Sequence, residues 1–459
     1  MNKILLVDPY FKDGQIPPNV PLGKIESQLK KNKISVDVID FNIPSKKILS
    51  LEDFKEIEED FIKNVIQKAK GYGLVYITTS FCVEVKPLLN FPRIKRIIDK
   101  LKEINVKNIF IGGATINHLL EFSPFTKKLL KKELGAEIIV GDELNIIKAI
   151  KKILDIEICL YDIPIRWDAW DFNDYPNYAS ILVNIGCPYK CNFCFEGKIY
   201  NKCNYNLSFE SLKETIKRLK TKHGINKIMI EDSVFISPNN YFEDFCLFMK
   251  NEKIQWMMYA RVNEIIKLKK KLKILKKSGC EGIIIGIETP RENLLEKTNK
   301  LVKLSQIKDA ISLLKKEGIA IQGTFLLAFY EDTLDNVTSD IAFGKGLNID
   351  HYRWHILQES FDKVNKGGQK GYNYYDYLDI DLNLPDNLLP ELLKTSSHLI
   401  YFDEHFLIRC IPYLKDSSIL RNIKYKNFNF EDFFKTLQKE LADSSKIYNE
   451  EEMNYLIFK

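Results

Sequence analysis

Short apolar runs alternate with amphipathic stretches through the first 158 residues of the chain. The runs are rich in Val, Ile and Leu, and they predict strands at 3–7, 35–39, 74–78, 108–111 and 137–140. Between them, apolar residues recur at spacings of three and four, which predicts helices over 25–31, 53–70 and 91–103. Strands that alternate with helices predict a doubly wound, Rossmann-like parallel sheet, whose ligands bind at the carboxyl ends of the strands.

Small and polar residues follow four of these predicted strands. In chain order they are Asp8, then Thr79 and Ser80, then Gly112, Gly113 and Ala114, and finally Gly141 and Glu143. The Gly112-Gly113 pair permits close backbone approach to a ligand such as a phosphate or a nucleotide tail. No G-x-G-x-x-G follows the first strand, which argues against a nicotinamide site.

Residues 159–178 mix Pro and Trp with aspartates and show no period, which indicates a linker. From residue 179 the alternation resumes. The expected strands are 181–184, 227–230, 255–259, 282–286, 322–328 and 352–357, and the expected helices are 209–222, 241–251, 265–278, 294–298, 305–317 and 335–345. Six strand–helix units predict a partial (βα)6 TIM-like barrel over 179–360, open on one side. Helical patterns at 388–401, 406–414 and 430–441 then predict a mostly helical C-terminal domain over 361–459.

The composition further limits the classes of protein to which the chain can belong. The 459 residues are 45% hydrophobic and 28% charged, which is too apolar for disorder. Lys and Arg exceed Asp and Glu by 68 to 62, and a net charge of +6 neither requires nor excludes a nucleic-acid partner. The N-terminal apolar run is too short for a signal peptide, and no run suffices for a spanning helix. We therefore expect a cytoplasmic protein whose nine cysteines are thiols or metal ligands.

Three cysteines share one short loop directly after the first strand of the predicted barrel. Cys187, Cys191 and Cys194 have CxxxCxxC spacing. Thiolates are the ligands of iron–sulfur clusters, and three of them hold three corners of a cubane, leaving one iron open to a substrate or cofactor. The alternative is a structural zinc site, which needs four ligands, usually in two pairs. The nearest fourth candidate, Cys203, stands alone, so the spacing favours the cluster.

This loop, opening a series of strand–helix units, resembles the radical S-adenosylmethionine (SAM) superfamily. Residues 286–290, Gly-Ile-Glu-Thr-Pro, are similar to a fourth-strand motif of the cobalamin-binding branch of that superfamily. The N-terminal Pro17-Pro18, the segment 21–23 and the segment 36–40 also resemble that branch, as do Ile111-Gly112-Gly113 and Gly141-Asp142-Glu143. The resemblance covers about residues 1–358.

The resemblance implies three cofactors. Cys187, Cys191 and Cys194 would bind a [4Fe–4S] cluster, and the open iron would bind SAM, whose reductive cleavage gives a 5′-deoxyadenosyl radical. Residues 1–158 would form a cobalamin-binding Rossmann-like domain, in which the residues that follow the strands contact the cofactor. Asp8 is followed by Tyr10 rather than the histidine of the Asp-x-His-x-x-Gly motif, which implies cobalt without a histidine ligand. The carboxyl ends of the sheet and the barrel mouth would face each other.

The resemblance also suggests residues that bind SAM. Where many members have Gly-Gly-Glu after the second barrel strand, this chain has Glu231-Asp232, which are candidates for the SAM amine. Arg261 is a candidate for the SAM carboxylate, the alternative being an exposed surface arginine. Glu288 ends an apolar strand, where an unpaired charge is expensive, so it is expected to contact a ribose or cofactor or to form an ion pair. No catalytic residue can be assigned.

The function implied is a C-methyltransferase that acts on an unactivated carbon of a small metabolite or peptide and draws electrons from a flavodoxin or ferredoxin. An alternative keeps both cofactors but catalyses rearrangement, cyclisation or ring contraction. A third possibility is a radical SAM enzyme whose N-terminal domain no longer binds cobalamin. A fourth, from a different class, is a metal-bearing binding module without turnover. We expect no membrane and no specific nucleic-acid partner.

Overall fold

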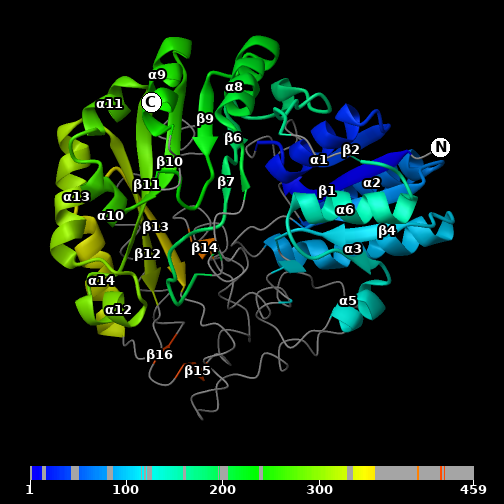
Figure 1. Cartoon of the computed structure of the whole chain (residues 1–459). Helices are drawn as coiled ribbons and strands as arrows, with labels where there is room; N and C mark the ends of the chain where they lie inside the picture. Colours follow the sequence, from blue (N-terminus) through cyan, green and yellow to red (C-terminus); the bar gives the residue numbers. More distant parts are fainter. Residues whose placement is uncertain are drawn as a thin grey trace.

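The computed structural model describes residues 3–12, 17–42, 51–79, 86–114, 116–117, 120, 127–158, 162–194, 196, 205–236, 241–327 and 334–356, with short strands at 401–402, 424–425 and 428–429. Two sheets, each carrying helices, lie next to one another (Figure 1). Within this part of the chain, no helix is both long and apolar enough to cross a membrane.

The N-terminal sheet has five parallel strands in the order β2-β1-β3-β4-β5. They are β1 (Ile4–Lys12), β2 (Val36–Asn42), β3 (Leu74–Thr78), β4 (Ile109–Gly112) and β5 (Glu137–Ile138). Helices α1 (Val20–Lys31) and α6 (Glu143–Leu154) pack on one face, while α2 (Leu51–Ala69), α3 (Lys86–Glu103) and α5 (Lys127–Leu134) pack on the other. The central strands β3 and β4 are buried on both faces, as expected of continuous apolar runs, and the doubly wound prediction is confirmed.

The central sheet contains six parallel strands and a short antiparallel edge strand, in the order β14-β13-β12-β11-β10-β9-β6. The parallel strands are β6 (Ala179–Ile181), β9 (Lys227–Ile230), β10 (Gln255–Arg261), β11 (Cys280–Glu288), β12 (Ala320–Leu327) and β13 (His351–Ile356). The edges β6 and β14 (Tyr401–Phe402) are not paired with each other, so the sheet is open.

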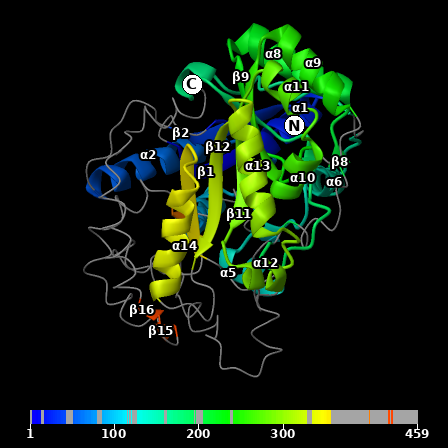
Figure 2. The ribbon, with the colours of Figure 1, turned by 90° about the vertical axis from the view of Figure 1, so that its left-hand side faces the viewer.

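Helices connect the parallel strands and cover one face of this sheet (Figure 2). They are α8 (Phe209–His223), α9 (Phe242–Glu252), α10 (Val262–Lys267), α11 (Leu272–Lys277), α12 (Glu292–Lys297), α13 (Leu304–Lys316) and α14 (Leu334–Gly346). Trp256 and Met258 of β10 pack into the large core beneath the helices, whereas Met257 and Tyr259 pack with Ile284 on the other face. That second face becomes polar toward the carboxyl ends of the strands, where Glu231 and Arg261 stand.

Three predicted elements need correction. The helix expected over 265–278 is divided into α10 and α11 by a turn that still buries Leu268. The strand expected over 181–184 is interrupted after Ile181, where Asp232 accepts the Val183 and Asn184 amides, and Asn184 begins a separate strand, β7 (Asn184–Ile185). Tyr401, expected to end a helix, lies in β14 and pairs with His355 of β13. Apart from β14, β15 (Lys424–Tyr425) and β16 (Phe428–Asn429), the predicted C-terminal helical domain lies outside the described residues.

The stretch predicted as a linker packs between the two sheets. Gly23 of α1 admits the indole of Trp167: a Cβ at Gly23 would lie 2.7 Å from Trp167 Cζ3. The Arg166 amide donates to Ser27 Oγ at 2.8 Å, and Tyr175 donates its hydroxyl to Asp40 at 2.8 Å. A single apolar core therefore runs from α1 through this stretch to the helices of the central sheet.

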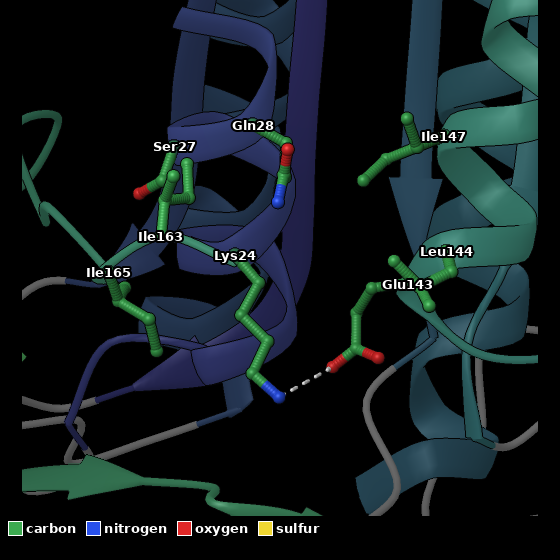
Figure 3. Close-up of a pocket in the computed structure, with 8 residues that line it drawn as sticks. All are labelled: Lys24, Ser27, Gln28, Glu143, Leu144, Ile147, Ile163 and Ile165. Carbon is green, nitrogen blue, oxygen red and sulfur yellow. Dashed lines mark ion pairs between the residues drawn. The ribbon is translucent and has the colours of Figure 1, made fainter. Parts of the chain in front are cut away.

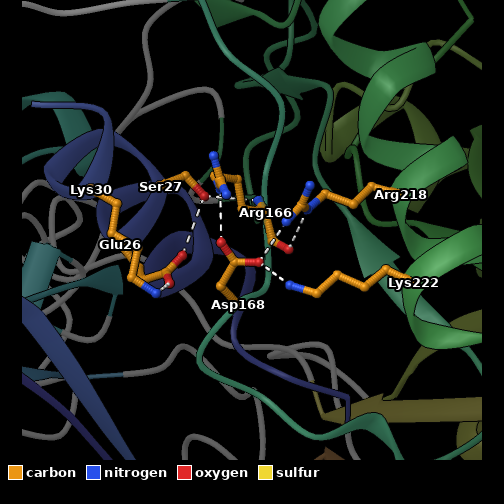
Figure 4. Close-up of polar contacts among 7 residues, drawn as sticks. All are labelled: Glu26, Ser27, Lys30, Arg166, Asp168, Arg218 and Lys222. Atoms are coloured by element: carbon orange, nitrogen blue, oxygen red, sulfur yellow. Dashed lines mark hydrogen bonds and ion pairs between the residues drawn. The ribbon is translucent and has the colours of Figure 1, made fainter. Parts of the chain in front are cut away.

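An ion cluster lies where this stretch meets α8 (Figure 4). Asp168 accepts from Arg166 Nε at 2.7 Å, from Arg218 Nη2 at 2.6 Å and from Lys222. Partial burial alone would raise the pKa of Asp168, but these hydrogen bonds outweigh that effect and hold the pKa well below its usual range. The cluster fixes the packed stretch to the first helix of the central unit.

Candidate active site

The cysteine loop begins just after the short strand β7 (Asn184–Ile185), which forms a hairpin with β8 (Tyr205–Asn206). Cys194 donates its amide to the Cys191 carbonyl at 3.1 Å, so the loop turns tightly between these two thiols. Since one loop of eight residues carries all three thiols, the three predicted cluster ligands lie close together.

The described residues contain no group of three or more His, Cys, Asp or Glu side chains converging on a single metal ion. A cubane does not need such convergence, since each of three thiolates binds a different iron. Burial raises the pKa of Cys187 to about 11 and that of Cys194 to about 12, so both are protonated at neutral pH until a metal displaces the proton. The donor set fits a cluster better than a zinc ion.

Arg261 reaches this loop from the carboxyl end of β10. Its Nη1 donates to Cys191 Sγ at 2.9 Å, and its Nη2 donates to the Lys300 carbonyl. The guanidinium lies over the ring of Tyr189, 4.0 Å from the centroid. The residue is 6% exposed, which excludes a surface arginine, and its buried Nε has no hydrogen-bond partner among the described residues. Sequence reasoning selected Arg261 but missed Tyr189, whose only signal was its place between two cysteines.

Glu288 forms a buried ion pair with Lys300. Gly286 makes room for this pair, because a Cβ there would lie 2.5 Å from Glu288 Oε1 and 2.6 Å from Lys300 Nζ. The Lys300 ammonium also lies over Phe193, 5.8 Å from the ring centroid, within the cysteine loop. Of the two expectations for Glu288, the structure therefore contains the ion pair. Lys300 was not identified from sequence.

Asp232 stands at the carboxyl end of β9 and is fully buried. Its two carboxylate oxygens accept from the Val183 amide at 2.7 Å and the Asn184 amide at 2.9 Å, and the Asn184 side chain adds a third bond. Burial raises the pKa of Asp232 to about 7 against the opposing effect of these donors. Through these contacts, Asp232 holds the segment just before Cys187 in place.

Glu231, by contrast, exposes its side chain on the side of the sheet that carries Ser180, whose hydroxyl bonds to it. Loss of hydration of its carboxyl against the surrounding protein raises the pKa of Glu231 above the usual glutamate range, and the hydrogen bond from Ser180 opposes this shift. A second carboxyl, Glu196, follows the cysteine loop and hydrogen-bonds with Ser233, and burial raises its pKa too. Glu196 was missed from sequence. Two carboxyls thus flank the cluster loop.

The carboxyl edge of the N-terminal sheet collects most of the other predicted residues. The buried Asp8 accepts from the Tyr10 amide at 3.1 Å and from Asn19 Nδ2 at 3.2 Å. Thr79 Oγ1 donates to the Gly112 carbonyl at 2.9 Å. Gly113 has a φ of +114°, and a Cβ there would lie 2.6 Å from the Thr79 carbonyl oxygen. Strands β3 and β4 therefore approach closely at this edge, which requires glycine.

The turn before α6 is tied to the same edge. Asn117 accepts from the Gly141 amide and donates to the Gly141 carbonyl, both at 2.8 Å. Gly141 has a φ of +116°. Ala114 and Gly141 remain partly exposed, so small residues with accessible backbone line this edge. Ser80 lies outside the described residues.

Glu143 begins α6 and points toward Lys24 of α1, with Oε1 3.8 Å from Nζ (Figure 3). Both side chains are buried and line a small pocket between the two helices, which Ile165 of the packed stretch also lines. Lys24 also interacts electrostatically with Asp232 and lowers its pKa. The expectation that the carboxyl ends of the N-terminal sheet face the mouth of the barrel stays a prediction.

Known proteins resemble this chain in sequence and in fold. Residues 181–343 match the family model of the radical SAM superfamily. An uncharacterized methyltransferase of Pyrococcus horikoshii is 29% identical over 45% of this chain and 45% of its own length. The bacteriochlorophyllide d C-12(1)-methyltransferase of Chlorobaculum tepidum is 24% identical over 71% of this chain and 74% of its own. The chain spans less than half the length of several curated relatives that it matches.

A solved structure shares the fold across both sheets. The radical SAM methyltransferase TsrM of Kitasatospora setae, with tryptophan and a SAM analogue bound, superposes with a TM-score of 0.62 at 15% identity. The match covers 80% of this chain and 76% of TsrM. A second TsrM structure, with cobalamin and a [4Fe–4S] cluster bound, gives a TM-score of 0.58 at 17% identity, over 79% of this chain and 77% of TsrM.

Proposed function

Because residues 181–343 form a radical SAM domain, we propose that this protein is a cobalamin-dependent radical SAM methyltransferase acting on an unactivated carbon of a small metabolite or peptide. The observation that carries the proposal is the cysteine loop, which gathers three thiols beside a buried guanidinium at the carboxyl ends of the strands. When bound, the cluster supplies the electron that cleaves SAM, and cobalamin carries the methyl group.

Cys187, Cys191 and Cys194 hold the cluster. A [4Fe–4S] cluster with three thiolates is negatively charged, and Arg261 supplies a compensating charge by its bond to Cys191. Within the described part of the chain the Nε atom has no partner, so the same guanidinium keeps a donor for the SAM carboxylate. Glu231 and Glu196 are the carboxyls for the SAM amine, whereas Asp232 positions the loop. Glu288 orients Lys300, and a ribose contact for Glu288 remains a prediction.

Cobalamin is assigned to the carboxyl edge of the N-terminal sheet, over 1–158. Support comes from the accessible backbone at Gly113, Ala114 and Gly141. Asp8 and Thr79 brace the edge rather than project from it. Tyr10 stands where a histidine ligand would, so the cobalt has no histidine from this chain at that position. The same proposal includes a linker over 159–178, a radical SAM barrel over 179–360 and a C-terminal helical domain over 361–459. It also includes a cytoplasmic location and a flavodoxin or ferredoxin as the reductant.

A single-turnover experiment tests the function without knowledge of the substrate. The protein is loaded with iron, sulfide and cobalamin, reduced, and given SAM with a deuterated methyl group. We expect both 5′-deoxyadenosine and S-adenosylhomocysteine, the latter with labelled methylcobalamin. Replacing Cys187, Cys191 and Cys194 by Ala should abolish 5′-deoxyadenosine, whereas Cys280→Ala, a buried cysteine away from the loop, should not.

The same products distinguish a methyltransferase from the alternative function, a rearrangement or cyclisation enzyme. Both readings give 5′-deoxyadenosine, but only methyl transfer consumes a second SAM. Absence of S-adenosylhomocysteine and labelled methylcobalamin, with 5′-deoxyadenosine formed, would favour rearrangement. Absence of both products would overturn the enzyme proposal.

A further inference from the structure

The segment over 267–277 is strongly basic. It covers the end of α10, the turn that follows and α11, and it contains no acidic residue. Its apolar residues Leu268, Leu272 and Leu275 are buried in the core beneath the helices. Its exposed lysines are Lys267, Lys269, Lys270, Lys271, Lys273 and Lys277. The segment therefore has an apolar inner side and a basic outer side.

The protein neutralises few of these charges. Lys271 pairs with Glu243 of α9, and the half-buried Lys276 pairs with Glu281 at 2.9 Å. The other lysines of the segment form no ion pair with the described residues. On α9, Asp244 is a second exposed carboxylate, whereas Lys250 adds a further exposed positive charge. Positive charge is thus in clear excess over this part of the surface.

Two exposed apolar residues accompany the lysines. Ile274 is 43% exposed and shares the outer side of α11 with Lys273 and Lys277, since residues one, three and four apart lie on neighbouring parts of a helix surface. Leu247 of α9 is 57% exposed. Both belong to the few large hydrophobic residues that the described part of the chain exposes.

Ile274 and Leu247 stand at the same level of two adjacent helices. Helices α9 and α11 lie side by side (Figures 1 and 2), and each runs back toward the start of the next parallel strand. The ion pair between Glu243 and Lys271 joins their first turns. Leu247 follows Glu243 by four residues, and Ile274 follows Lys271 by three. The two apolar side chains therefore form one small patch with lysines around it.

This composition fits a lipid surface better than a nucleic acid. Segment 267–277 contains lysines and no arginine, whereas nucleic-acid phosphates are often held by the bidentate guanidinium of arginine, and unpaired bases stack on aromatic rings. Aliphatic side chains such as Ile274 and Leu247 supply neither contact. They can enter the boundary of the acyl chains while long lysine side chains keep their ammonium groups at anionic headgroups.

We propose that residues 267–277, together with Leu247 and Lys250 of α9, form a docking surface for an anionic lipid bilayer. Leu247 and Ile274 enter the acyl boundary, and the lysines contact the headgroups. The end of α11 leads to the amino end of β11, whereas the cysteine loop contacts the carboxyl end of β10, so docking leaves the candidate active site uncovered.

This inference is independent of the proposed function. It replaces the sequence-based expectation of no membrane partner, because contact with the surface of a bilayer needs no spanning helix.

Co-sedimentation of the full chain with vesicles tests this surface. The vesicles contain phosphatidylcholine alone or equal parts of phosphatidylcholine and phosphatidylglycerol, at low and at high ionic strength. One charge variant is Lys270→Glu/Lys273→Glu/Lys277→Glu, and a milder one carries glutamine at the same three positions. The apolar variant is Leu247→Ser/Ile274→Ser.

Two matched controls lie outside the surface. Lys127→Glu/Lys128→Glu/Lys132→Glu reverses three exposed lysines of α5, and Leu301→Ser removes a leucine that is 67% exposed. Circular dichroism and thermal unfolding confirm that every variant is folded.

We expect the wild-type chain to bind the anionic vesicles, to bind less as salt rises and to leave phosphatidylcholine vesicles unbound. The triple charge reversal should lower the partition coefficient about 100-fold or more, and the glutamine variant should lower it less. The apolar variant should lower it about 10-fold and keep the salt dependence. The controls should change it less than about 3-fold.

Two results with vesicles would overturn the proposal. One is a wild-type chain that does not bind anionic vesicles. The other is an equal loss in the α5 control and in the surface variant, which would assign binding to the net charge of the whole chain. Fluorescence anisotropy with a mixed-sequence DNA duplex tests the other anionic partner. DNA binding that the triple charge reversal abolishes, without any vesicle binding, would assign the surface to nucleic acid instead.

Discussion

Arg261 Nη1 lies 2.9 Å from Cys191 Sγ, although 70 residues separate the two in the chain. The bond joins the end of β10 to the middle of the cysteine loop, and Tyr189 packs against the same guanidinium. A donor on a cluster thiolate stabilises the reduced cluster, which carries one more negative charge. Under the proposed function, the carboxyl end of β10 contributes to the chemistry of the cluster as well as to the fold.

Replacing Arg261 should therefore lower the reduction potential of the cluster. We expect Arg261→Gln to shift the midpoint by tens of millivolts in the negative direction, and Arg261→Lys to shift it less because the charge remains. Potentiometric titration followed by electron paramagnetic resonance gives the midpoint. An unchanged midpoint in Arg261→Gln, at full iron content, would show that the bond to Cys191 is lost once the cluster is bound.

Glu231 and Asp232 are neighbours in sequence but should respond differently to removal of charge. Glu231→Gln should keep the iron content and raise the Kd for SAM about 10-fold, as for loss of one charged hydrogen bond. Asp232→Asn turns an amide group toward backbone donors and should lower iron occupancy instead. Iron analysis and calorimetric SAM binding separate the two effects. Identical behaviour of the two variants would contradict these roles.

Asp168 should make the stability of the chain depend on pH. Its pKa is depressed in the folded chain, so its stabilisation is fully present above the unfolded value of about 4 and is lost as the pH falls toward the folded value. We expect Asp168→Asn to cost about 1–2 kcal/mol at neutral pH, less than a fully buried pair because Arg166 and Lys222 are half exposed. The difference from wild type should shrink below about pH 4.

Urea unfolding at several pH values measures this dependence. Asp99→Asn, which removes an exposed helical pair with Lys95, is the control and should cost less than about 0.5 kcal/mol. A loss in Asp168→Asn that is independent of pH would mean that the side chain acts through packing instead of charge.

Gly23 should not tolerate a larger residue. A methyl group at this position meets the Trp167 ring at 2.7 Å, so we expect Gly23→Ala to destabilise the chain by about 1–3 kcal/mol, although alanine favours a helix. Gly346→Ala at the end of α14 places its methyl group in open space and serves as the control. Thermal unfolding compares the two. Equal stability of Gly23→Ala and wild type would show that Trp167 shifts at little cost.

Much of the fold was predictable because parallel strands buried on both faces appear as uninterrupted apolar runs. The prediction of β3 over 74–78 coincides with the strand observed. The prediction failed where polar contacts decide the structure: the strand expected over 181–184 is interrupted between β6 and β7, where Asp232, about 48 residues away, accepts the Val183 and Asn184 amides. The turn between α10 and α11 buries both Leu268 and Leu272 in the same core, so the apolar periodicity alone does not distinguish it from a continuous helix.

The candidate site was predictable as far as local spacing reaches. The cysteine loop is continuous in sequence, so its three ligands could be identified together. Lys300 and Glu196 could not, because a lysine or glutamate with no distinctive neighbours gives no signal until the fold brings it to Glu288 or Ser233. Arg261 was selected, but its bond to Cys191 depends on the register of β10 against the cysteine loop.

Iron and cobalt content per chain, after anaerobic purification from cells supplied with cobalamin, tests the central claim most directly. We predict about four irons and about one cobalt per wild-type chain, and cobalt without iron when Cys187, Cys191 and Cys194 are replaced by Ala. Four irons without cobalt would contradict the cobalamin-dependent methyltransferase, and a single zinc without iron would contradict the radical SAM chemistry itself.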